Sequence, residues 1–302
     1  MSSNAPRSID QYLKALGDAL ANEEPALRQD ALSDAEEYLR AEIAQHPDKS
    51  EADVLEAIAA SYGHPEEVAD AYRATEATVR KAMQGTPRPP ANNVWGKIFG
   101  VFTDFRTYTS LFLALLALPT GILYFTVAVT GLAISAGTSI LIFGLPLFLI
   151  FIGLVRILSL AEGRLVEGLV GTRMPRRTPY VIKGVALFER IKIMLTDRRT
   201  WTTILYMILA LRIGIFSFVV AIVGVTVPLA LLFAPFGVML GLNHHITIDD
   251  SSAYEYMGTG GLVLCSIAGF LLFTLMLHAV RFLGRMHGSL AKTLLVARQG
   301  EA

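Results

Sequence analysis

Long runs without a charged side chain fill much of the second half of this chain of 302 residues. Several runs reach 20 residues or more, the length of helix that crosses the hydrocarbon core of a bilayer. Hydrophobic residues make up 53% of the sequence and charged residues only 17%, which excludes a wholly soluble globular protein. The runs predict four membrane-spanning helices, at about residues 110–133, 138–155, 203–227 and 260–280.

Basic residues set the expected orientation of these helices. The segment from Arg156 to Arg199, between the second and third spans, carries ten Lys or Arg, and the tail after the fourth span carries more. The other two loops, at residues 134–137 and 228–259, carry none. Because loops rich in Lys and Arg stay on the cytoplasmic side, we expect a multi-pass protein of the bacterial inner membrane with both termini in the cytoplasm.

Residues 204–242 form one apolar stretch that only Arg212 interrupts. The stretch is long enough for two spans, but the basic tail favours one span, so we take 228–242 as a bent extension or a segment at the outer interface. Arg212 falls near the middle of the bilayer, where an arginine marks a sensing site or an internal pairing, or extends its side chain to the interface. Both interpretations of Arg212 stay open.

The formal net charge of zero conceals two halves of opposite sign. Residues 1–88 hold 9 basic and 17 acidic side chains, a net of −8, and the remainder holds a net of +8. We therefore expect an acidic domain at 1–83, a Pro-rich linker at 84–94 and a membrane domain at 95–302. With Cys265 as the only cysteine, the chain forms no internal disulfide, and nothing in the first residues resembles a cleavable signal.

The acidic segment predicts four short helices. Ser8 and Ser50 precede apolar periodicity at N-cap positions, and Pro25 and Pro65 suit the first turns of the second and fourth helices. The fold class is therefore all-α: a small cytoplasmic helical bundle followed by a four-span membrane domain. Adjacent carboxylates on a helix do not converge on one catalytic site. We interpret these pairs as a solvated face and as the surface on which a partner would bind: Glu36, Glu37, Glu66 and Glu67.

The same segment resembles a known family, the HAAS-type signalling domain. The resemblance rests on Tyr12-Leu13 with Leu16, on the acidic helix that ends at Glu36-Glu37-Tyr38, and on the closing run from Gly63 through Pro65-Glu66-Glu67 to Ala69. It covers about 65 residues. It implies a cytoplasmic interaction module, often encoded beside a PadR-type transcription regulator, and no enzymatic activity.

The membrane half contains an internal repeat. Residues 103–109 (TDFRTYT), here called the first threonine turn, recur 93 positions later as residues 196–202 (TDRRTWT), the second threonine turn. A second match, offset by 125, relates the segment after Val155-Arg156 to the segment after Val280-Arg281. Each copy holds two spans, which predicts two parallel hairpins related by an axis along the membrane normal.

This duplicated arrangement resembles the sensor domain that precedes the kinase in many bacterial sensor histidine kinases. The resemblance rests on Arg199-Thr200-Trp201, Tyr206, the bend at Leu118 to Gly121 and the amphipathic segments that close each copy. It implies sensing. Arg212 replaces the bend proline in the second copy, and we expect no kinase after residue 302, so kinase activity is not carried over.

The outer loop carries paired histidines and carboxylates. His244 and His245, followed by Asp249 and Asp250, suggest a metal or pH sensor, or an ordinary polar cap, because adjacent side chains do not easily share one ion. The basic amphipathic segment 180–195 suits anionic lipid headgroups or a groove on a partner helix. We predict no metal and no cofactor.

These features favour a signalling protein. We expect a membrane sensor that couples a membrane or external stimulus to a cytoplasmic protein partner through its acidic module, with anionic lipids as further partners and no direct binding of nucleic acid. The alternative, suggested by Arg212 and the repeat, is a small transporter or a permease-associated subunit. The sequence has no phosphate-binding loop, no zinc-binding His-Glu helix and no nucleophile elbow, so an enzyme is not expected. The oligomeric state stays open, a homo-oligomer included.

Overall fold

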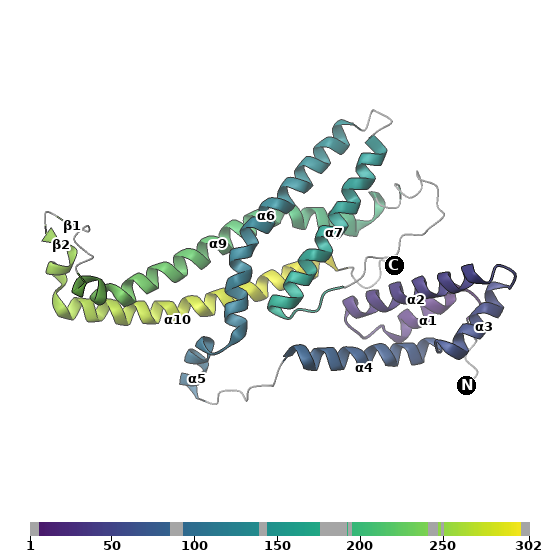
Figure 1. Cartoon of the computed structure of the whole chain (residues 1–302), viewed down its shortest axis with the longest axis horizontal. Coiled ribbons are helices and arrows are strands. Elements are labelled where there is room, and N and C mark those ends of the chain that lie inside the picture. The colour runs from purple at the N-terminus through teal and green to yellow at the C-terminus, as the bar shows by residue number, and fades with distance from the viewer. Residues whose placement is uncertain are drawn as a thin grey trace. The chain divides into compact units, whose positions relative to one another are not determined.

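The structure is a computed structural model of the whole chain, and it describes residues 6–84, 93–138, 144–175, 192, 195–240, 247–248 and 251–296 (Figure 1). The helices are α1 (Ile9–Ala19), α2 (Pro25–Gln45), α3 (Glu51–Ser61), α4 (Pro65–Gln84), α5 (Val94–Phe99), a 3-10 turn η1 (Gly100–Phe102), α6 (Phe105–Gly137), α7 (Gly144–Val170), α9 (Arg198–Met239) and α10 (Ala253–Leu295). One antiparallel ladder joins β1 (Thr247–Ile248) to β2 (Ser251–Ser252), with Thr247 opposite Ser252. Apart from this short ladder the described elements are helical, and the all-α prediction is confirmed.

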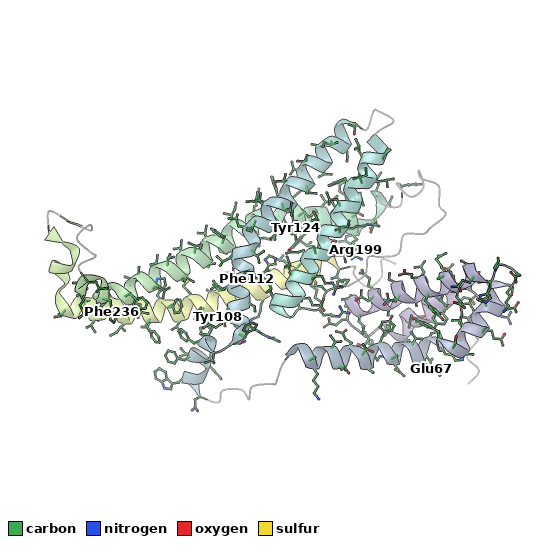
Figure 2. The ribbon with its side chains drawn as sticks, viewed as in Figure 1. Glu67, Tyr108, Phe112, Tyr124, Arg199 and Phe236 are labelled. Carbon is green, nitrogen blue, oxygen red and sulfur yellow. The ribbon has the colours of Figure 1, made fainter. Side chains whose placement is uncertain are left out.

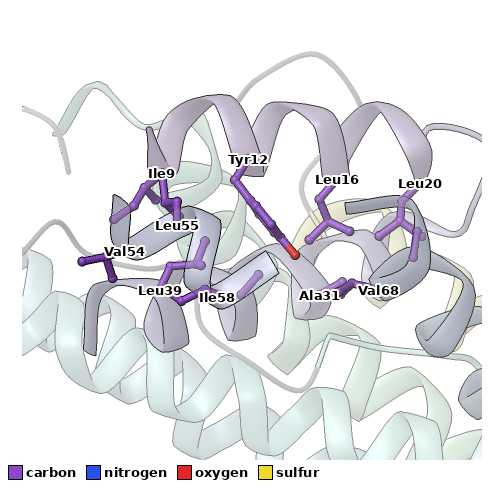
Figure 3. Packing of buried hydrophobic residues seen from close by; sticks show 12 residues of the cluster. Ile9, Tyr12, Leu16, Leu20, Ala31, Leu39, Val54, Leu55, Ile58 and Val68 are labelled. Atoms are coloured by element: carbon purple, nitrogen blue, oxygen red, sulfur yellow. The ribbon is translucent and has the colours of Figure 1, made fainter. Parts of the chain in front are cut away.

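The first four helices form a small bundle around an apolar core. Ser8 caps α1 by accepting a hydrogen bond from the backbone N–H of Gln11, and Ser50 caps α3 in the same way through Asp53. Pro25 and Pro65 begin α2 and α4, where their missing N–H groups cost no helical bond. The core is built from residues of all four helices (Figure 3): Ile9, Tyr12, Leu16, Leu20, Ala31, Ala35, Leu39, Val54, Leu55, Ile58, Val68 and Ala69.

Tyr12 ties the first helix of this bundle to the turn before the fourth. Its ring is fully buried, and its hydroxyl donates a 2.8 Å hydrogen bond to the carbonyl oxygen of Gly63. Gly63 has a φ of 106°, a left-handed conformation that glycine adopts without steric cost. The motif at the start of the acidic segment and the motif at its end are therefore in direct contact.

Four described helices are long and apolar enough to cross a membrane. They are α6, α7 from Pro146, α9 and α10 from Gly258. Three of them extend beyond both ends of the spans predicted from the sequence, whereas α7 begins at Gly144, inside the predicted span 138–155, and continues past its end to Val170. Residues up to Met239 continue α9 through Pro228 and Pro235, so the described part of 228–242 is a helical extension. Gly258 has a φ of 59°, which interrupts α10 near its start.

Small residues let the membrane helices approach closely. An added Cβ at Gly121 of α6 would lie 2.6 Å from the carbonyl oxygen of Ala210 in α9, and one at Gly214 of α9 would meet the carbonyl oxygen of Ala117 in α6. The two contacts are equivalent in the repeat, because Gly121 and Gly214 are 93 positions apart, as are Ala117 and Ala210. Helices in lipid associate through this kind of close backbone contact.

The contacts divide the chain into two compact units. One unit contains Met1–Arg88, Ala128–Tyr206 and Leu290–Ala302, and the other contains Pro89–Val127 and Met207–Ser289. The first unit therefore combines the described N-terminal bundle with α7, the start of α9 and the end of α10. In the second unit, α5 and η1 place aromatic rings against α10, with Phe102 and Phe270 stacked at 5.8 Å.

Candidate functional site

The two threonine turns build the same local structure. Helices α6 and α9 each begin at the third residue of their turn. In the first turn the Oδ1 atom of Asp104 accepts a 3.0 Å hydrogen bond from the backbone N–H of Arg106. In the second turn Asp197 accepts a 3.0 Å bond from the N–H of Arg199. Each aspartate thereby satisfies a backbone donor at the start of a membrane helix.

An aromatic side chain ties each turn to the segment before it. The hydroxyl of Tyr108 donates to the carbonyl oxygen of Phe102 at 2.8 Å, and Nε1 of Trp201 donates to the carbonyl oxygen of Leu195 at 2.7 Å. Tyr108 is 48% exposed and Trp201 is 47% exposed. Amphipathic rings of this kind lie at the level of the lipid headgroups, which places both turns at a membrane interface.

The first threonine turn is closed by an ion pair with α10. Nη2 of Arg281 lies 2.8 Å from Oδ2 of Asp104. Gly284, one turn further along α10, lies so close to Ser110 that an added Cβ would come within 2.7 Å of the serine Oγ. The side chain of Arg106 is exposed. This side of the turn leaves no space for a ligand between Gly284 and Ser110.

The second threonine turn instead borders a hollow beside α7. The hollow encloses about 390 Å³ of space between atoms, its open mouth included. Its lining is Ile152, Val155, Arg156, Ser159, Leu160, Asp197, Arg199, Thr200 and Thr203. Arg199, labelled in Figure 2 at the start of α9, donates from Nη1 to the side-chain oxygen of Gln29 in α2 at 2.7 Å. A residue of the membrane domain and a residue of the N-terminal bundle are therefore joined directly at the edge of this hollow.

The turn after α7 returns the chain to the bundle. Gly171 has a φ of 79°, and its N–H donates to the carbonyl oxygen of Glu167 at 3.0 Å, as in a glycine C-cap. Met174 is fully buried, and an added Cβ at Gly163 would lie 3.4 Å from it, in ordinary contact. This geometry positions Arg173, which lies between Gly171 and Met174.

Arg173 holds a cluster of carboxylates from three helices, here called the arginine cluster. Its Nη2 lies 2.9 Å from Oδ2 of Asp30 in α2, its Nε lies 3.0 Å from Oε1 of Glu76 in α4, and its Nη1 lies 3.4 Å from Oε1 of Glu167 in α7. The Arg173 side chain is 11% exposed and the three carboxylates are 6–10% exposed. Nη1 also donates to the carbonyl oxygen of Met174 at 2.6 Å. Such desolvated, multiply bonded pairs fix one arrangement of the groups that they join.

Two further polar contacts lie in the same unit. Nζ of Lys292, near the end of α10, lies 3.3 Å from Oε2 of Glu24 at the start of α2. The buried hydroxyl of Tyr206 in α9 donates to the buried carboxylate of Glu162 in α7 at 2.6 Å. Arg173 after α7, Arg199 of α9 and Lys292 of α10 thus each contact the N-terminal bundle within this unit.

The comparison with known proteins gives one family. A family described as "Putative sensor" matches residues 112–295, more than half of the chain. The chain belongs to this sensor family. The matched region includes the four membrane-length helices almost entirely, together with the second threonine turn, the hollow and Arg173. No curated protein and no solved structure matches the chain.

The N-terminal bundle lies outside the region that the sensor family matches, so its resemblance to the HAAS-type domain stays a prediction. The structure places the carboxylates predicted to face a partner on α2 and α4: Glu36, Glu37, Glu66 and Glu67. Glu36 forms a 3.0 Å ion pair with Arg40 one turn along α2, and Glu67 accepts a 3.1 Å bond from the backbone N–H of His64. Glu36 and Glu67 therefore have local structural roles, and Glu37 and Glu66 are exposed residues.

The predicted sensing residues of the membrane domain have different outcomes. Arg212 lies in α9 and is exposed, and its predicted role in sensing or pairing stays a prediction. His244, His245, Asp249 and Asp250 lie outside the described residues, as does most of the basic segment 180–195. The metal and pH hypotheses for the outer loop therefore stay predictions.

Sequence reasoning missed the arginine cluster. Asp30, Glu76 and Glu167 are single carboxylates on otherwise ordinary amphipathic helices, and Arg173 is one of ten basic residues in a charged segment. One signal was available: the acidic bundle and the basic cytoplasmic segment have opposite charge, which favours contact between them. The charge balance predicts such a contact without naming the residues that form it.

Proposed function

We propose that this chain is a signalling protein of the bacterial inner membrane, with both termini in the cytoplasm. Its sensor-family domain would respond to a membrane or external stimulus, and its N-terminal bundle would pass the response to a cytoplasmic protein partner. The observation that supports coupling most strongly is the arginine cluster, because one guanidinium group links α7 of the sensor domain to α2 and α4 of the bundle. The proposal assigns the chain no reaction of its own.

The proposed mechanism is a change in docking. A stimulus that shifts the cytoplasmic end of α7 moves Glu167 and the turn that carries Arg173. Such a shift lengthens the contacts of Arg173 with Asp30 and Glu76, and the acidic faces of α2 and α4 become accessible. An ion pair weakens steeply once water enters between its charges, so a small movement has a large effect on docking.

The partner is proposed from the HAAS resemblance: a PadR-type regulator encoded beside the gene of this chain. We expect the exposed carboxylates of Glu37 and Glu66 to contribute to its binding surface. An acidic surface favours a partner with a complementary basic face, and such contacts act chiefly on the association rate and on specificity.

Hydrogen exchange of the full chain in lipid nanodiscs tests the coupling. Amide exchange in α2 and α4 is measured in bilayers of different thickness and different content of anionic lipid. We expect exchange in these helices to rise in the bilayers that alter α7, and to respond less in Arg173→Met, in which the link is already broken. Equal exchange in every bilayer for the wild-type chain contradicts the proposed coupling.

Titration with the purified PadR-type regulator tests the partner. We expect the regulator to bind Arg173→Met more tightly than the wild-type chain in the same nanodiscs, because the bundle is undocked. Glu37→Gln and Glu66→Gln should weaken that binding, whereas Lys97→Gln, a change on α5, should not. A regulator that binds none of these chains removes the partner from the proposal and leaves the exchange experiment unaffected.

A further inference from the structure

The hollow at the second threonine turn combines positive charge with several hydroxyl groups. Two guanidinium groups, of Arg156 and Arg199, border it together with the hydroxyls of Ser159, Thr200 and Thr203. Its one carboxylate, Asp197, already accepts bonds from the backbone N–H of Arg199 at 3.0 Å and from Oγ1 of Thr200 at 3.2 Å. The lining therefore offers donors and a formal net charge of +1.

This lining matches the chemistry of a phosphate group. A guanidinium group presents a planar fork of N–H donors that fits two oxygens of a phosphate, and the hydroxyl of Thr203 is a further donor. The hydroxyls of Ser159 and Thr200 already donate, to the carbonyl oxygen of Arg156 at 2.8 Å and to Asp197 at 3.2 Å. The start of α9 adds the positive end of a long helix dipole beside the same space. The apolar wall of Ile152, Val155 and Leu160 separates this space from water on one side.

The depth of the hollow suits a ligand at the membrane surface. Trp201, the residue after Thr200, has a half-exposed ring whose Nε1 is bonded to Leu195, and such rings lie at headgroup level.

We infer that this hollow binds the phosphate group of an anionic ligand, and that the bound phosphate competes with Gln29 for Arg199. The competition rests on the proposed function, because it makes ligand binding loosen the contact of the sensor domain with α2. The bond to Gln29 uses Nη1 of Arg199 at 2.7 Å, so a phosphate that accepts from both Nη1 and Nη2 displaces Gln29. Occupancy of the hollow and docking of the bundle at Gln29 therefore oppose each other.

The first threonine turn supplies a matched control within the chain. Arg106 occupies the position of Arg199, but its side chain is exposed. Ser159 and Thr203 of the hollow correspond to Gly284 and Ser110, which are in close contact. The first turn thus has the same backbone without the hollow, and an arginine substitution there tests charge alone.

Binding is tested with the full chain in a neutral detergent. The probes are dioctanoyl phosphatidylglycerol, the zwitterionic dioctanoyl phosphatidylcholine and inorganic phosphate, and affinity is measured by calorimetric titration. We expect saturable binding of an anionic probe that Arg199→Gln and Arg156→Gln each weaken about tenfold, since 1.4 kcal/mol corresponds to about a factor of ten. Arg106→Gln should change the affinity less than about twofold.

The probes also identify the source of the phosphate. Binding of phosphatidylglycerol without binding of inorganic phosphate assigns the hollow to a lipid headgroup, and comparable binding of inorganic phosphate assigns it to a free anion. The inference is overturned if no anionic probe binds, or if Arg106→Gln weakens binding as much as Arg199→Gln. The second outcome would show general attraction to a basic surface.

Gln29→Ala tests the competition separately. This change removes the side chain that holds Arg199 and leaves the lining of the hollow intact, so we expect tighter binding of the anionic probe than in the wild-type chain. Unchanged affinity in Gln29→Ala, with weaker binding in Arg199→Gln, overturns the competition while the hollow remains a binding site. The proposed coupling through Arg173 is decided by the exchange experiment in nanodiscs, so the two failures are distinguishable.

Discussion

The two threonine turns have the same backbone and different surroundings. Both begin a membrane helix with an aspartate cap and an aromatic tether, at positions 93 residues apart. The exposed arginine of the first turn is Arg106, whereas its counterpart Arg199 is bonded to Gln29 of the N-terminal bundle. Local geometry is therefore common to the two turns, and the bond to Gln29 is a property of the second turn.

A polar pair distinguishes one of the helix contacts that the repeat relates. Tyr206 of the second copy and Glu162 of the first form a buried hydrogen bond, and the equivalent positions in the repeat hold Leu113 and His287. Buried polar groups are costly unless they are bonded to one another, so a bonded pair specifies one arrangement of α7 against α9. The difference indicates that α7 and α9 are held by a polar contact that Leu113, which has no hydroxyl, cannot provide.

The largest expected effect comes from removing Arg173, whose guanidinium group joins the turn after α7 to α2 and α4. Arg173→Met leaves Asp30, Glu76 and Glu167 together without their shared guanidinium group. Breaking a buried ion pair typically costs about 3–5 kcal/mol, and here the loss falls on docking of α2 and α4. Hydrogen exchange of the full chain in nanodiscs should show faster exchange in both helices.

Arg40→Gln is the matched control for that change. It removes the partner of Glu36, but Arg40 is 36% exposed and the pair lies one turn apart on α2. Such pairs contribute about 0.3–0.5 kcal/mol. Exchange in α2 and α4 that is the same in Arg173→Met as in Arg40→Gln would contradict a docking role for the arginine cluster.

The next effect concerns the buried hydrogen bond between Tyr206 and Glu162, whose equivalent positions in the repeat hold Leu113 and His287. Tyr206→Phe removes the donor that bonds Glu162 and leaves a buried carboxylate oxygen with one hydrogen bond fewer. The expected loss is about 1–3 kcal/mol, seen as a lower thermal midpoint in detergent. Tyr108→Phe removes the half-exposed hydrogen bond of Tyr108 with Phe102 and should lower the thermal midpoint less. Equal losses in the two variants would show that the buried bond of Tyr206 contributes no more than the half-exposed one.

The glycine crossing tests what the two copies share. Gly121→Ala and Gly214→Ala each place a methyl group against a facing backbone carbonyl, at Ala210 and Ala117 respectively. We expect similar losses of about 1–3 kcal/mol for the two changes, because overpacking forces the backbones apart. Gly153→Ala, where an added Cβ meets nothing within 4 Å, is the control and should be neutral. Clearly unequal effects at Gly121 and Gly214 would show that the crossing is not shared evenly.

The sequence predicts the helices well because their signals are local. Caps at Ser8 and Ser50 and prolines at the starts of α2 and α4 mark ends within a residue or two of those in the structure. The ends of the membrane helices are predicted less well. The apolar runs indicate which residues suit the bilayer, whereas α6 begins within the polar first threonine turn, and α7 and α10 continue as helix into the polar segments that follow their spans.

The candidate site could be predicted only in outline. Opposite charges on the bundle and on the cytoplasmic segment favour contact between them, but the choice of Arg173 among ten basic residues depends on the turn at Gly171 and on residues up to 143 positions apart. Arg199 lies in the repeat, yet its difference from Arg106 arises from what surrounds it. Such long-range contacts leave no periodic signal in the chain.

The smallest expected effect comes from the titration of three buried tyrosines in the N-terminal bundle, which leaves stability unchanged at neutral pH. Burial raises the pKa of Tyr12, Tyr62 and Tyr72 above the usual value, and nearby charged or ionisable groups, Asp34 among them for Tyr62 and Tyr72, add to the increase. The unfolded chain therefore loses these protons first, once the pH passes about 10. Stability is fully present below that pH and falls as the pH rises toward the raised pKa values. The contacts of Arg173 and Arg199 with α2 and α4 should be lost in this range, while the pair of Arg281 with Asp104 persists. Tyr12→Phe removes one titrating group and should reduce the slope of stability against pH by about a third, measured by circular dichroism with tyrosinate absorbance. A slope that Tyr12→Phe leaves unchanged would show that this buried hydroxyl does not link alkaline pH to loss of the bundle.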